Sequence, residues 1–518
     1  MPRGQRVRVF VGAANAAAGL NHSKREKMSD NGPRPTKSAV GRGVAWSAAG
    51  SAATQAVNFI AFLIIARSLD PSSFGLVAIA ALFVALFTVF VEQGFTHALV
   101  QRADLEPEHL DTAFWTNMGF AVLLIGGLNA VAAWVADLFG EAALGSVLRV
   151  LSLSLLFGAL SGVQIAILQR GMRFGELSLR PLVGALLGGA IGIALAWAGF
   201  GVWSLVAQAL VSQAITSLGF WLATGWRPKF LYSVDHLQHL LGFGLHILGS
   251  NLVNFANSRA PEFFIGLLLG KAPLGIYAVA AKVQASLSQV MIGTIMRVSL
   301  ATLSRLQDEL STFKRAFYLG IQLTAAVAFP IFVGIAVLSE DIATAVFGSQ
   351  WIDAAPLIAI LSITGLTGTV GTLTVTAINS LGFPKRNYQL DATAAVFTAI
   401  VVLLAAQVGI VAVAIALLVR AVIFFPLRFM LLRQIADVRF SELLRVIWGT
   451  GVSAAVMATV VHLSSYIDFH LHAGLRLLVL VMVGAVTYGL SMLLFAPKTL
   501  ALGVAFFAAT VRGEEVSS

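Results

Sequence analysis

The sequence predicts an all-α, polytopic membrane protein, because of its composition, its apolar segments and the placement of its basic residues. Of its 518 residues, 58% are hydrophobic and only 11% are charged, and the mean hydropathy is +0.87. Soluble globular domains carry about 25% charged residues, so the chain lies far outside their range. It contains no cysteine, which excludes disulfides and thiolate metal sites.

Apolar segments that are each long enough to span a bilayer fill most of the chain, since a transmembrane helix needs about 20 residues. The fourteen expected spans are 44–65, 74–98, 112–136, 145–168, 179–198, 202–223, 240–258, 274–300, 315–338, 354–381, 388–407, 409–427, 446–463 and 474–495. Only short charged or Gly/Pro-containing segments separate them, which leaves no room for a large soluble domain.

Basic residues indicate the orientation of these spans. With the N-terminus in the cytoplasm, the external loops hold only Arg67, Arg259 and Lys271, whereas every cytoplasmic loop is basic. Because an excess of Lys and Arg marks cytoplasmic loops, both termini are expected there. The net charge of +10 has the same origin, so no nucleic-acid partner is expected.

The spans divide the chain into regions with different expected roles. These are a basic, disordered cytoplasmic tail at 1–43, an N-terminal six-helix bundle at 44–223, a cytoplasmic linker at 224–239, a C-terminal six-helix bundle at 240–431, two additional transmembrane helices at 432–496, and a cytoplasmic tail with an interfacial helix at 497–518. A signal peptide is rejected, because cleavage near Ala18 would leave a basic cluster to be translocated. Met28 is an alternative translation start.

An internal repeat relates the two bundles. The matched landmarks are Gly50, Ser51 and Asn58 with Gly249, Ser250 and Asn257, Phe74-Gly75 with Leu274-Gly275, and Gly94 with Gly293. A unit of six spans keeps both copies in the same orientation, so a pseudo-two-fold axis along the membrane normal is expected. Two such bundles would enclose a central cavity, and rocking of one against the other would give alternating access.

The spans at 240–258 and 274–300 carry Arg259, Glu262 and Lys282 at or within them. A charge near the bilayer centre costs roughly 2.5–3.5 kcal/mol, so such residues usually face a protein interior or a water-filled path. Polar residues also recur at helical spacing on one face of each span: His246, Ser250, Asn254 and Ser258 on the first, and Lys282, Ser286, Gln289 and Gly293 on the second. They either line a cavity or hold helices together. Pro261 is expected to kink or end its helix.

The sequence resembles the polysaccharide transporter branch of the multidrug/oligosaccharidyl-lipid/polysaccharide flippase superfamily. This branch contains the Wzx-type O-antigen and exopolysaccharide flippases. The resemblance covers about residues 40–495. It rests on Ala66-Arg67-Ser68-Leu69-Asp70 with Phe74-Gly75, Asn257-Ser258-Arg259 through Leu269-Gly270 with Leu274-Gly275-Ile276-Tyr277, Leu303-Ser304-Arg305-Leu306-Gln307-Asp308, and Phe347-Gly348 with Trp351.

The resemblance implies a flippase of the bacterial inner membrane that moves a polyprenyl-pyrophosphate-linked oligosaccharide for exopolysaccharide, capsule or O-antigen biosynthesis. Expected partners are the lipid-linked substrate, membrane lipid, H⁺ or Na⁺ as coupling ion, and polysaccharide polymerase and chain-length machinery. The candidate pyrophosphate ligands are Lys282, Arg259 and Arg420; the candidate cavity-lining residues are Asn58, Ser51, Asn254, Ser286 and Gln289; the candidate ion-coupling residues are Glu92, His97 and Glu262.

Several of these residues have structural alternatives. Arg259 and Glu262 stand at the spacing of a helical ion pair, and Arg420 could instead extend toward the membrane surface. Glu92 and His97 could form a pair at a helix end. The family often has arginine where this chain has Lys282, and lysine lacks the planar fork that suits phosphate.

Other functions remain as alternatives. A lipid II flippase would need the same head-group chemistry, whereas a multidrug exporter would need acids to meet cationic substrates, and the first span has none. A membrane-embedded polymerase usually carries a large external loop, which is missing. No HExxH, phosphate-loop or Asp-x-Asp motif occurs, so neither enzyme activity nor a cofactor is expected. The pairs His236/His239 and His470/His472 are isolated and are taken as solvated, so no metal site is expected.

Overall fold

The computed structural model describes residues 37–92, 95–102, 104–306, 309–467 and 470–503. Residues Met1–Ala45 and Trp46–Ser518 form two compact units, and all contacts given below lie within the second. Most of the predicted basic tail and of the C-terminal tail lies outside the described residues. Where the description begins, the first helix starts at Lys37, inside the predicted tail.

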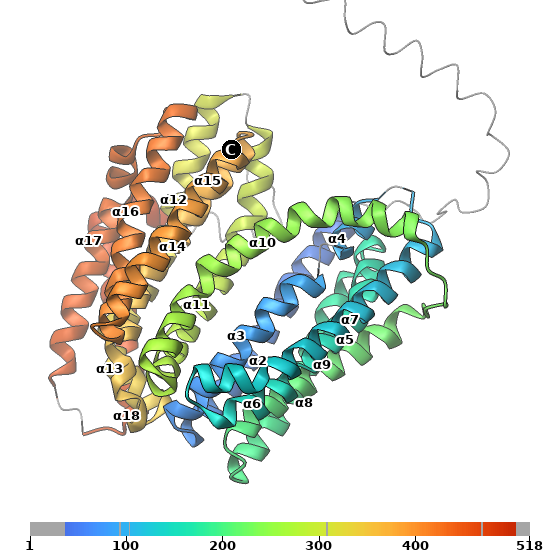
Figure 1. Cartoon of the computed structure of the whole chain (residues 1–518). Helices are drawn as coiled ribbons and strands as arrows, with labels where there is room; N and C mark the ends of the chain where they lie inside the picture. The colour runs from blue at the N-terminus through green and yellow to red at the C-terminus, as the bar shows by residue number, and fades with distance from the viewer. Residues whose placement is uncertain (1–36, 93–94, 103, 307–308, 468–469, 504–518) are drawn as a thin grey trace, which may run out of the picture. The chain divides into compact units, whose positions relative to one another are not determined.

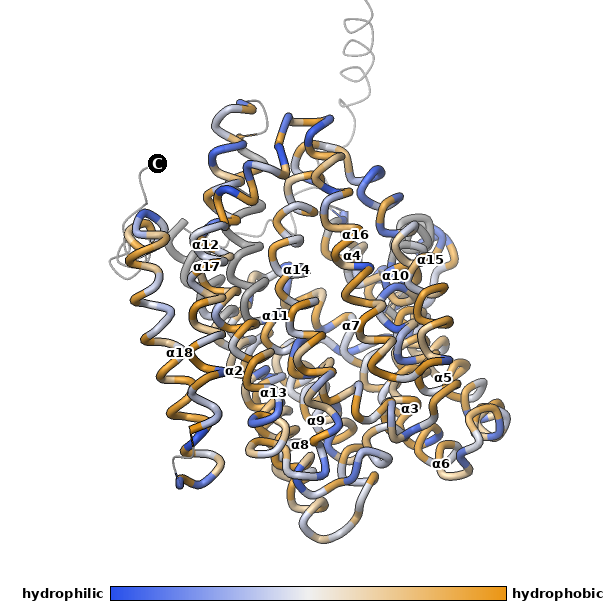
Figure 2. The backbone as a smooth tube through the Cα atoms, turned by 90° about the vertical axis from the view of Figure 1, so that its left-hand side faces the viewer, coloured by the Kyte–Doolittle hydropathy of each residue, from blue (hydrophilic) through white to orange (hydrophobic). Residues whose placement is uncertain are grey.

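The described residues form helices joined by short turns, and contain no strand (Figure 1). The elements are α2 (Lys37–Ser68), α3 (Pro71–Glu92), α4 (Phe95–Gln101), α5 (Pro107–Leu138), α6 (Ala142–Leu151), α7 (Ser154–Arg170), α8 (Phe174–Trp197), α9 (Val202–Thr224), α10 (Val234–Leu269), α11 (Lys271–Arg305), α12 (Leu310–Val337), α13 (Ser339–Asp341), the π-helical turn η1 (Ile342–Phe347), the 3₁₀ turn η2 (Ser349–Ala354), α14 (Ala355–Ser380), α15 (Pro384–Ala406), α16 (Ile410–Ala436), α17 (Phe440–Ser465) and α18 (Ala473–Phe495). Apolar residues dominate along most of these helices (Figure 2).

Twelve helical segments among the described residues are long and apolar enough to cross a membrane. They correspond to twelve of the fourteen predicted spans, and the all-α, polytopic class is confirmed. The other two predicted spans fall on α10 and α11, which are 36 and 35 residues long but are not among the twelve. Their polar and charged residues dilute the apolar stretch, so the count of fourteen is not confirmed.

Helices that are close in sequence pack together within each half. In the first half α8 packs along α9, and α7 packs on α5 and α9; in the second half α14 packs on α11, α12 and α16, and α10 packs on α15. The last two helices pack against each other, and α17 also packs on α12. One cluster of buried apolar side chains crosses between the halves, and includes Ile79, Leu144, Ile265 and Leu357.

The turn between α10 and α11 lies on the side that the basic residues assign to the exterior, and we call this the external side. There the first turns of α3 and α11 meet through glycines. A Cβ on Gly75 would stand 1.7 Å from the carbonyl oxygen of Lys271, and a Cβ on Gly275 would stand 1.8 Å from that of Pro71. The contact is reciprocal and uses two landmarks of the predicted repeat. Only glycine permits so close an approach of two backbones.

Polar contacts reinforce this external junction. Lys271 Nζ at the start of α11 donates to Glu141 Oε2 ahead of α6 over 2.6 Å. From the other half, the buried Trp351 donates its indole N–H to the carbonyl oxygen of Ala66 over 2.9 Å, and its ring packs edge-on against Phe74. The two halves are therefore joined on the external side by backbone contact, an ion pair and a buried indole.

The structure adds local detail at two of the predicted spans. Pro261 does not end its helix, because α10 continues to Leu269. Proline is tolerated inside membrane helices when neighbouring helices satisfy the freed backbone groups. The span predicted at 145–168 is confirmed as the single span Ala142–Arg170, within which a two-residue turn at Ser152 and Leu153 separates α6 from α7. Ser152 Oγ donates to the carbonyl oxygen of Arg149 over 2.6 Å, so a side-chain bond competes with the helix at this point.

Candidate functional site

Three predicted pyrophosphate ligands lie at a similar depth on neighbouring helices. Arg259 on α10 and Lys282 on α11 lie about 16 Å and about 18 Å along their helices from Gly270, at 1.5 Å per residue. Arg420 lies about 15 Å from the external start of α16 by the same rule. The three residues therefore lie at similar distances along their helices from the external side. The helices α10, α11 and α16 are in contact through α10.

Arg259 is held by an acid on its own helix. Its Nη1 donates to both carboxylate oxygens of Glu262, over 2.6 and 2.9 Å. The arginine side chain is 44% exposed and that of the glutamate only 16%. The pair that the spacing suggested is therefore formed, and it compensates much of the charge of Arg259. Glu262, a candidate for ion coupling, is engaged in this pair.

Arg420 is held by an amide instead. Its Nη2 donates to Asn257 Oδ1 on α10 over 3.0 Å. Its Nε is buried and finds no acceptor among the described residues. The buried Tyr277 of α11 lies within electrostatic reach of Arg259, Glu262 and Arg420, which places it among them. The bond to Asn257 holds the guanidinium of Arg420 against α10, and an amide partner leaves its positive charge without an acidic partner.

Lys282 is half-buried, and within the described part of the chain it forms no hydrogen bond or ion pair. Its strongest charged neighbour is Arg259, which repels it. A second cation so close raises the free energy of the empty site and favours the entry of an anion. Lys282 is thus the site's most available cation among the described residues.

One further pair of charges belongs to this region, and the sequence analysis missed it. Arg428 of α16 forms an ion pair with Asp391 of α15, and both charges act on Arg420. The span predicted at 409–427 ends just before Arg428, whereas α16 extends to Ala436. The signal was available, because Asp391 is an acid within an apolar span and such residues need a partner.

The cluster as a whole is cationic. Its described members are four cations, Arg259, Lys282, Arg420 and Arg428, and two carboxylates, Glu262 and Asp391. Two positive charges therefore remain uncompensated by acids, and they lie on helices α11 and α16. A group with two or more negative charges and several acceptor oxygens matches this arrangement.

The predicted cavity-lining residues differ from one another in solvent exposure and in hydrogen bonding. Ser286 is 7% exposed, and its Oγ is buried without a partner in the described structure. Gln289 is exposed and accepts a hydrogen bond from Gln55 of α2, which connects the two halves. Asn254 and Ser51 are exposed and Asn58 is half-buried. The side chains of Glu92 and His97, and those of His246 and Ser250, lie outside the described residues.

Comparison with known proteins gives the family. A family model described as "Polysaccharide biosynthesis protein" matches residues 64–356, more than half of the chain. The chain belongs to this family. The matched residues include Arg259, Glu262 and Lys282, but end before α15 and α16.

Relatives within this family are bacterial. The chain is 30% identical over 332 residues to succinoglycan biosynthesis transport protein ExoT of Rhizobium meliloti, which covers 64% of this chain and 67% of that protein. It is 22% identical over 327 residues to lipopolysaccharide biosynthesis protein WzxC of Escherichia coli, covering 62% and 66%, and 26% identical over 279 residues to teichuronic acid biosynthesis protein TuaB of Bacillus subtilis, covering 53% and 57%. The matched regions thus span between 57% and 67% of these relatives.

Solved structures share the fold. The lipid II flippase MurJ in an inward closed conformation superposes with a TM-score of 0.72, at 15% identity, over 87% of this chain and 99% of that one. An inward-facing MATE family transporter of the MOP superfamily gives 0.56, at 16% identity, over 74% and 96%. At such identities the likeness concerns the fold alone, which is that of a multi-pass membrane transporter.

Proposed function

We propose that this protein moves a polyprenyl-pyrophosphate-linked oligosaccharide across the bacterial inner membrane for the synthesis of exopolysaccharide, capsule or O-antigen. Its family, and the names of relatives that act in succinoglycan, lipopolysaccharide and teichuronic acid biosynthesis, support this substrate class. The single observation that carries the proposal is the cationic cluster near the middle of the second half.

The cluster suits the pyrophosphate of such a substrate. Lys282 carries a charge without a described partner, and Arg420 is compensated only by an amide. Charge-assisted contacts to phosphate oxygens are stronger than neutral ones, and they offset the loss of hydration when the anion leaves water. The polyprenyl tail can remain in lipid, so only the head group has to pass through the protein.

The net positive charge of the cluster also distinguishes the proposed function from a multidrug exporter. A multidrug exporter for organic cations would need uncompensated acids at this depth, whereas both acids here are engaged in ion pairs. A lipid II flippase would use the same pyrophosphate chemistry. That alternative is distinguished by phenotype, because blocking the cell-wall lipid stops growth, whereas blocking exopolysaccharide export leaves cells viable.

Transport is proposed to proceed by alternating access between the two halves, with both termini in the cytoplasm. The contact at Gly75 and Gly275 joins the two halves on the external side, so external release would require α3 and α11 to separate. The ion pair between Lys271 and Glu141 must break in the same step. We keep H⁺ or Na⁺ as the proposed coupling ion, and a polysaccharide polymerase with its chain-length machinery as proposed partners.

The test is a deletion in the native bacterium, complemented with wild type, Lys282→Ala or Arg420→Ala. We expect the deletion to abolish surface polysaccharide and to accumulate lipid-linked repeat units on the cytoplasmic side. Wild type should restore the polymer, while each variant should restore at most about a tenth of it, since losing one charge-assisted phosphate contact of about 1.5–3 kcal/mol costs roughly tenfold or more.

Lys314→Ala is the matched control, because Lys314 pairs with Asp437 at the end of α16 and lies outside the cluster. Full complementation by this variant, with equal amounts of all proteins in the membrane, would assign the loss to the cluster. Normal polymer in the deletion strain would refute export of a polysaccharide precursor. Arrested growth with unaltered polymer precursors would favour the cell-wall lipid instead.

A further inference from the structure

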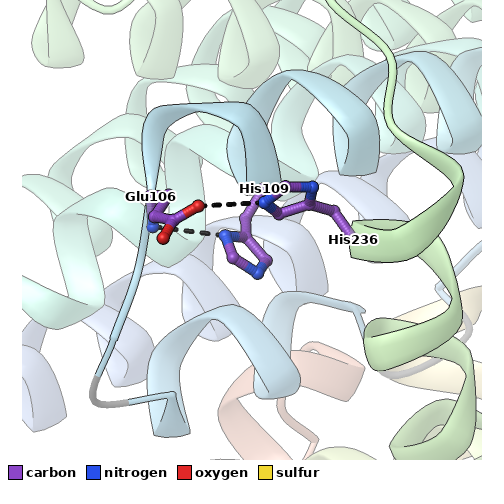
Figure 3. A group of neighbouring side chains, drawn as sticks. All are labelled: Glu106, His109 and His236. Carbon is purple, nitrogen blue, oxygen red and sulfur yellow. Dashed lines mark hydrogen bonds and ion pairs between the residues drawn. The ribbon is translucent and has the colours of Figure 1, made fainter.

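Three side chains that commonly ligate metals meet where the linker between the two halves reaches α5 (Figure 3). Glu106 precedes α5, His109 lies in its first turn, and His236 lies in the first turn of α10. One ligand atom from each residue lies within 4.8 Å of the others. The group stands apart from the cationic cluster, near the opposite end of α10, on the side that the basic residues assign to the cytoplasm.

The geometry of the group is defined by hydrogen bonds. His236 Nε2 lies 3.0 Å from Glu106 Oε2, and His109 Nδ1 accepts from the backbone N–H of Glu106 over 3.2 Å. The two imidazole rings pack edge to face with their centroids 4.2 Å apart. Figure 3 shows both rings turned toward Glu106, each with one nitrogen facing it. His236 Nε2 faces the carboxylate of Glu106, whereas His109 Nδ1 faces its backbone N–H.

A second layer of contacts orients the ligands. Ser233 Oγ lies 2.5 Å from Nδ1 of His236, and the backbone N–H of Ser233 donates to Thr112 Oγ1 over 3.2 Å. In metal sites the nitrogen of a ligating histidine that does not bind the metal is normally held by such a partner, which fixes the ring. His109 is only 2% exposed, so its ring has little freedom to turn away.

We propose that Glu106, His109 and His236 form a site for a divalent transition metal ion of the zinc class. Two imidazoles and a carboxylate are the ligand set that zinc takes with a fourth position left to water. At zinc–ligand distances of about 2.0–2.2 Å, ligand atoms are separated by about 3.4 Å, so small side-chain rotations would close the present spacing. When the metal binds, His109 Nδ1 loses the hydrogen bond from the backbone N–H of Glu106 and ligates the metal instead. Hard cations such as Mg²⁺ prefer sites made of oxygen alone.

A metal at this place would fasten the linker. The linker already contacts α5 through the backbone N–H of Lys229, which donates to Asp111 Oδ1 over 2.8 Å, and through Phe230, which stacks on Trp115 at 4.9 Å. Coordinate bonds to the metal would link the start of α5 in the first half to α10 in the second. Because it would favour the arrangement in which its ligands are together, it would stabilise the attachment of the linker, by a free energy that grows with the logarithm of the metal concentration divided by Kd.

The experiment measures zinc binding to the full chain in detergent, after removal of any histidine tag. Isothermal titration should give one Zn²⁺ per chain, and no binding of Mg²⁺ at the same concentrations. His236→Ala should abolish the binding, and Ser233→Ala should weaken it by roughly 10-fold or more. His462→Ala is the matched control, because His462 lies at the end of α17 beside Tyr466, and its affinity should equal that of wild type.

Limited trypsin digestion gives a second readout of the same site. In the linker, Arg227 precedes a proline that blocks cleavage, so Lys229 supplies the tryptic bond. Zn²⁺ should slow this cut several-fold in wild type and in His462→Ala, but not in His236→Ala. Should His236→Ala fail to fold, Glu106→Gln takes its place. Equal zinc affinity in wild type and in the ligand variants, or cleavage unaffected by Zn²⁺ in wild type, would overturn the proposal and leave a hydrogen-bonded helix cap.

Discussion

Arg259 and Arg420 are held in different ways, although they lie at a similar depth. Arg259 Nη1 donates to both carboxylate oxygens of Glu262 on its own helix, whereas Arg420 donates to the amide of Asn257 on another. Removing one partner of a buried ion pair leaves the other charge uncompensated, and this is more destabilising than removing both. The roles of the two arginines can therefore be separated by substitution.

We predict that Arg259→Ala destabilises the protein by about 1–3 kcal/mol, because the largely covered carboxylate of Glu262 would lose its partner. The double variant Arg259→Ala/Glu262→Gln should recover most of this loss. Thermal unfolding in detergent, with Arg259→Ala, Glu262→Gln and the double variant compared with wild type, measures the coupling between the two residues. If the double variant is as unstable as Arg259→Ala alone, the ion pair does not account for the effect.

A second residue-scale prediction concerns the start of α3. Asp70 precedes Pro71 and accepts hydrogen bonds from the backbone N–H of Ser72 and the hydroxyl of Ser73, over 3.0 and 2.6 Å. Burial raises the pKa of Asp70, but the hydrogen bond from Ser73 and those from the backbone outweigh it, so the pKa lies below its ordinary value.

A depressed pKa means that Asp70 contributes stability above its unfolded-state pKa, and that this contribution is lost as the pH falls through the folded-state value. Asp70→Ala should therefore lower the stability at pH 7 by about 1 kcal/mol, as expected for an N-cap. Thermal unfolding at pH 7 and below about pH 4 should show the difference between wild type and variant shrinking on acidification. An unchanged difference would exclude the cap as its origin.

Among the elements, α3 and α11 have the closest described approach of two backbones. Gly75 and Gly275 each face the first carbonyl of the other helix, at distances that no Cβ could occupy. Both positions lie in a first helical turn on the external side. The predicted repeat thus coincides with a symmetric contact, in which each copy of the landmark packs against the other.

We predict that Gly75→Ala and Gly275→Ala each destabilise the protein by about 1–3 kcal/mol, because the added methyl forces the two helices apart. Gly119→Ala in α5 is the matched control, since a Cβ there would meet no atom within 4 Å. That substitution should be neutral or stabilising by up to about 1 kcal/mol. Thermal unfolding measures all three. Equal effects of Gly75→Ala and Gly119→Ala would contradict the close contact.

The whole molecule has a proposed orientation that follows from its basic loops. The linker between α9 and α10 would face the cytoplasm, and the loop between α15 and α16 would face the exterior. Phe230 in the linker and Val408 in that loop are 91% and 82% exposed. Because the chain contains no cysteine, single cysteines can report on the two sides without removal of others.

We predict that a membrane-impermeant maleimide applied to intact spheroplasts labels Val408→Cys but not Phe230→Cys. Permeabilisation should make both react, and wild type should react in neither condition. The reason is that loops rich in Lys and Arg are retained in the cytoplasm. Labelling of Phe230→Cys in intact spheroplasts would reverse the proposed topology.

The helical class, twelve of the spans and the family resemblance could be predicted because membrane insertion acts on local properties. Each span must be apolar over about 20 residues, and this requirement is visible in any window of the chain. The intramembrane charges Arg259, Glu262 and Lys282 could be found by the same rule, since charge stands out against an apolar background. The spacing of Arg259 and Glu262 also predicted their ion pair.

The neighbours of those charges could be known only from the tertiary structure. Asn257 as the partner of Arg420, and Asp391 as that of Arg428, lie on other helices, and no sequence spacing relates them. The convergence of Glu106, His109 and His236 depends equally on packing, and we had taken His236 as a solvated residue. Insertion energies are local and additive along the chain, whereas contacts between helices depend on which faces meet. By itself, the sequence therefore determined the membrane-spanning helices and the charges they carry, and the tertiary structure decided which charges act together.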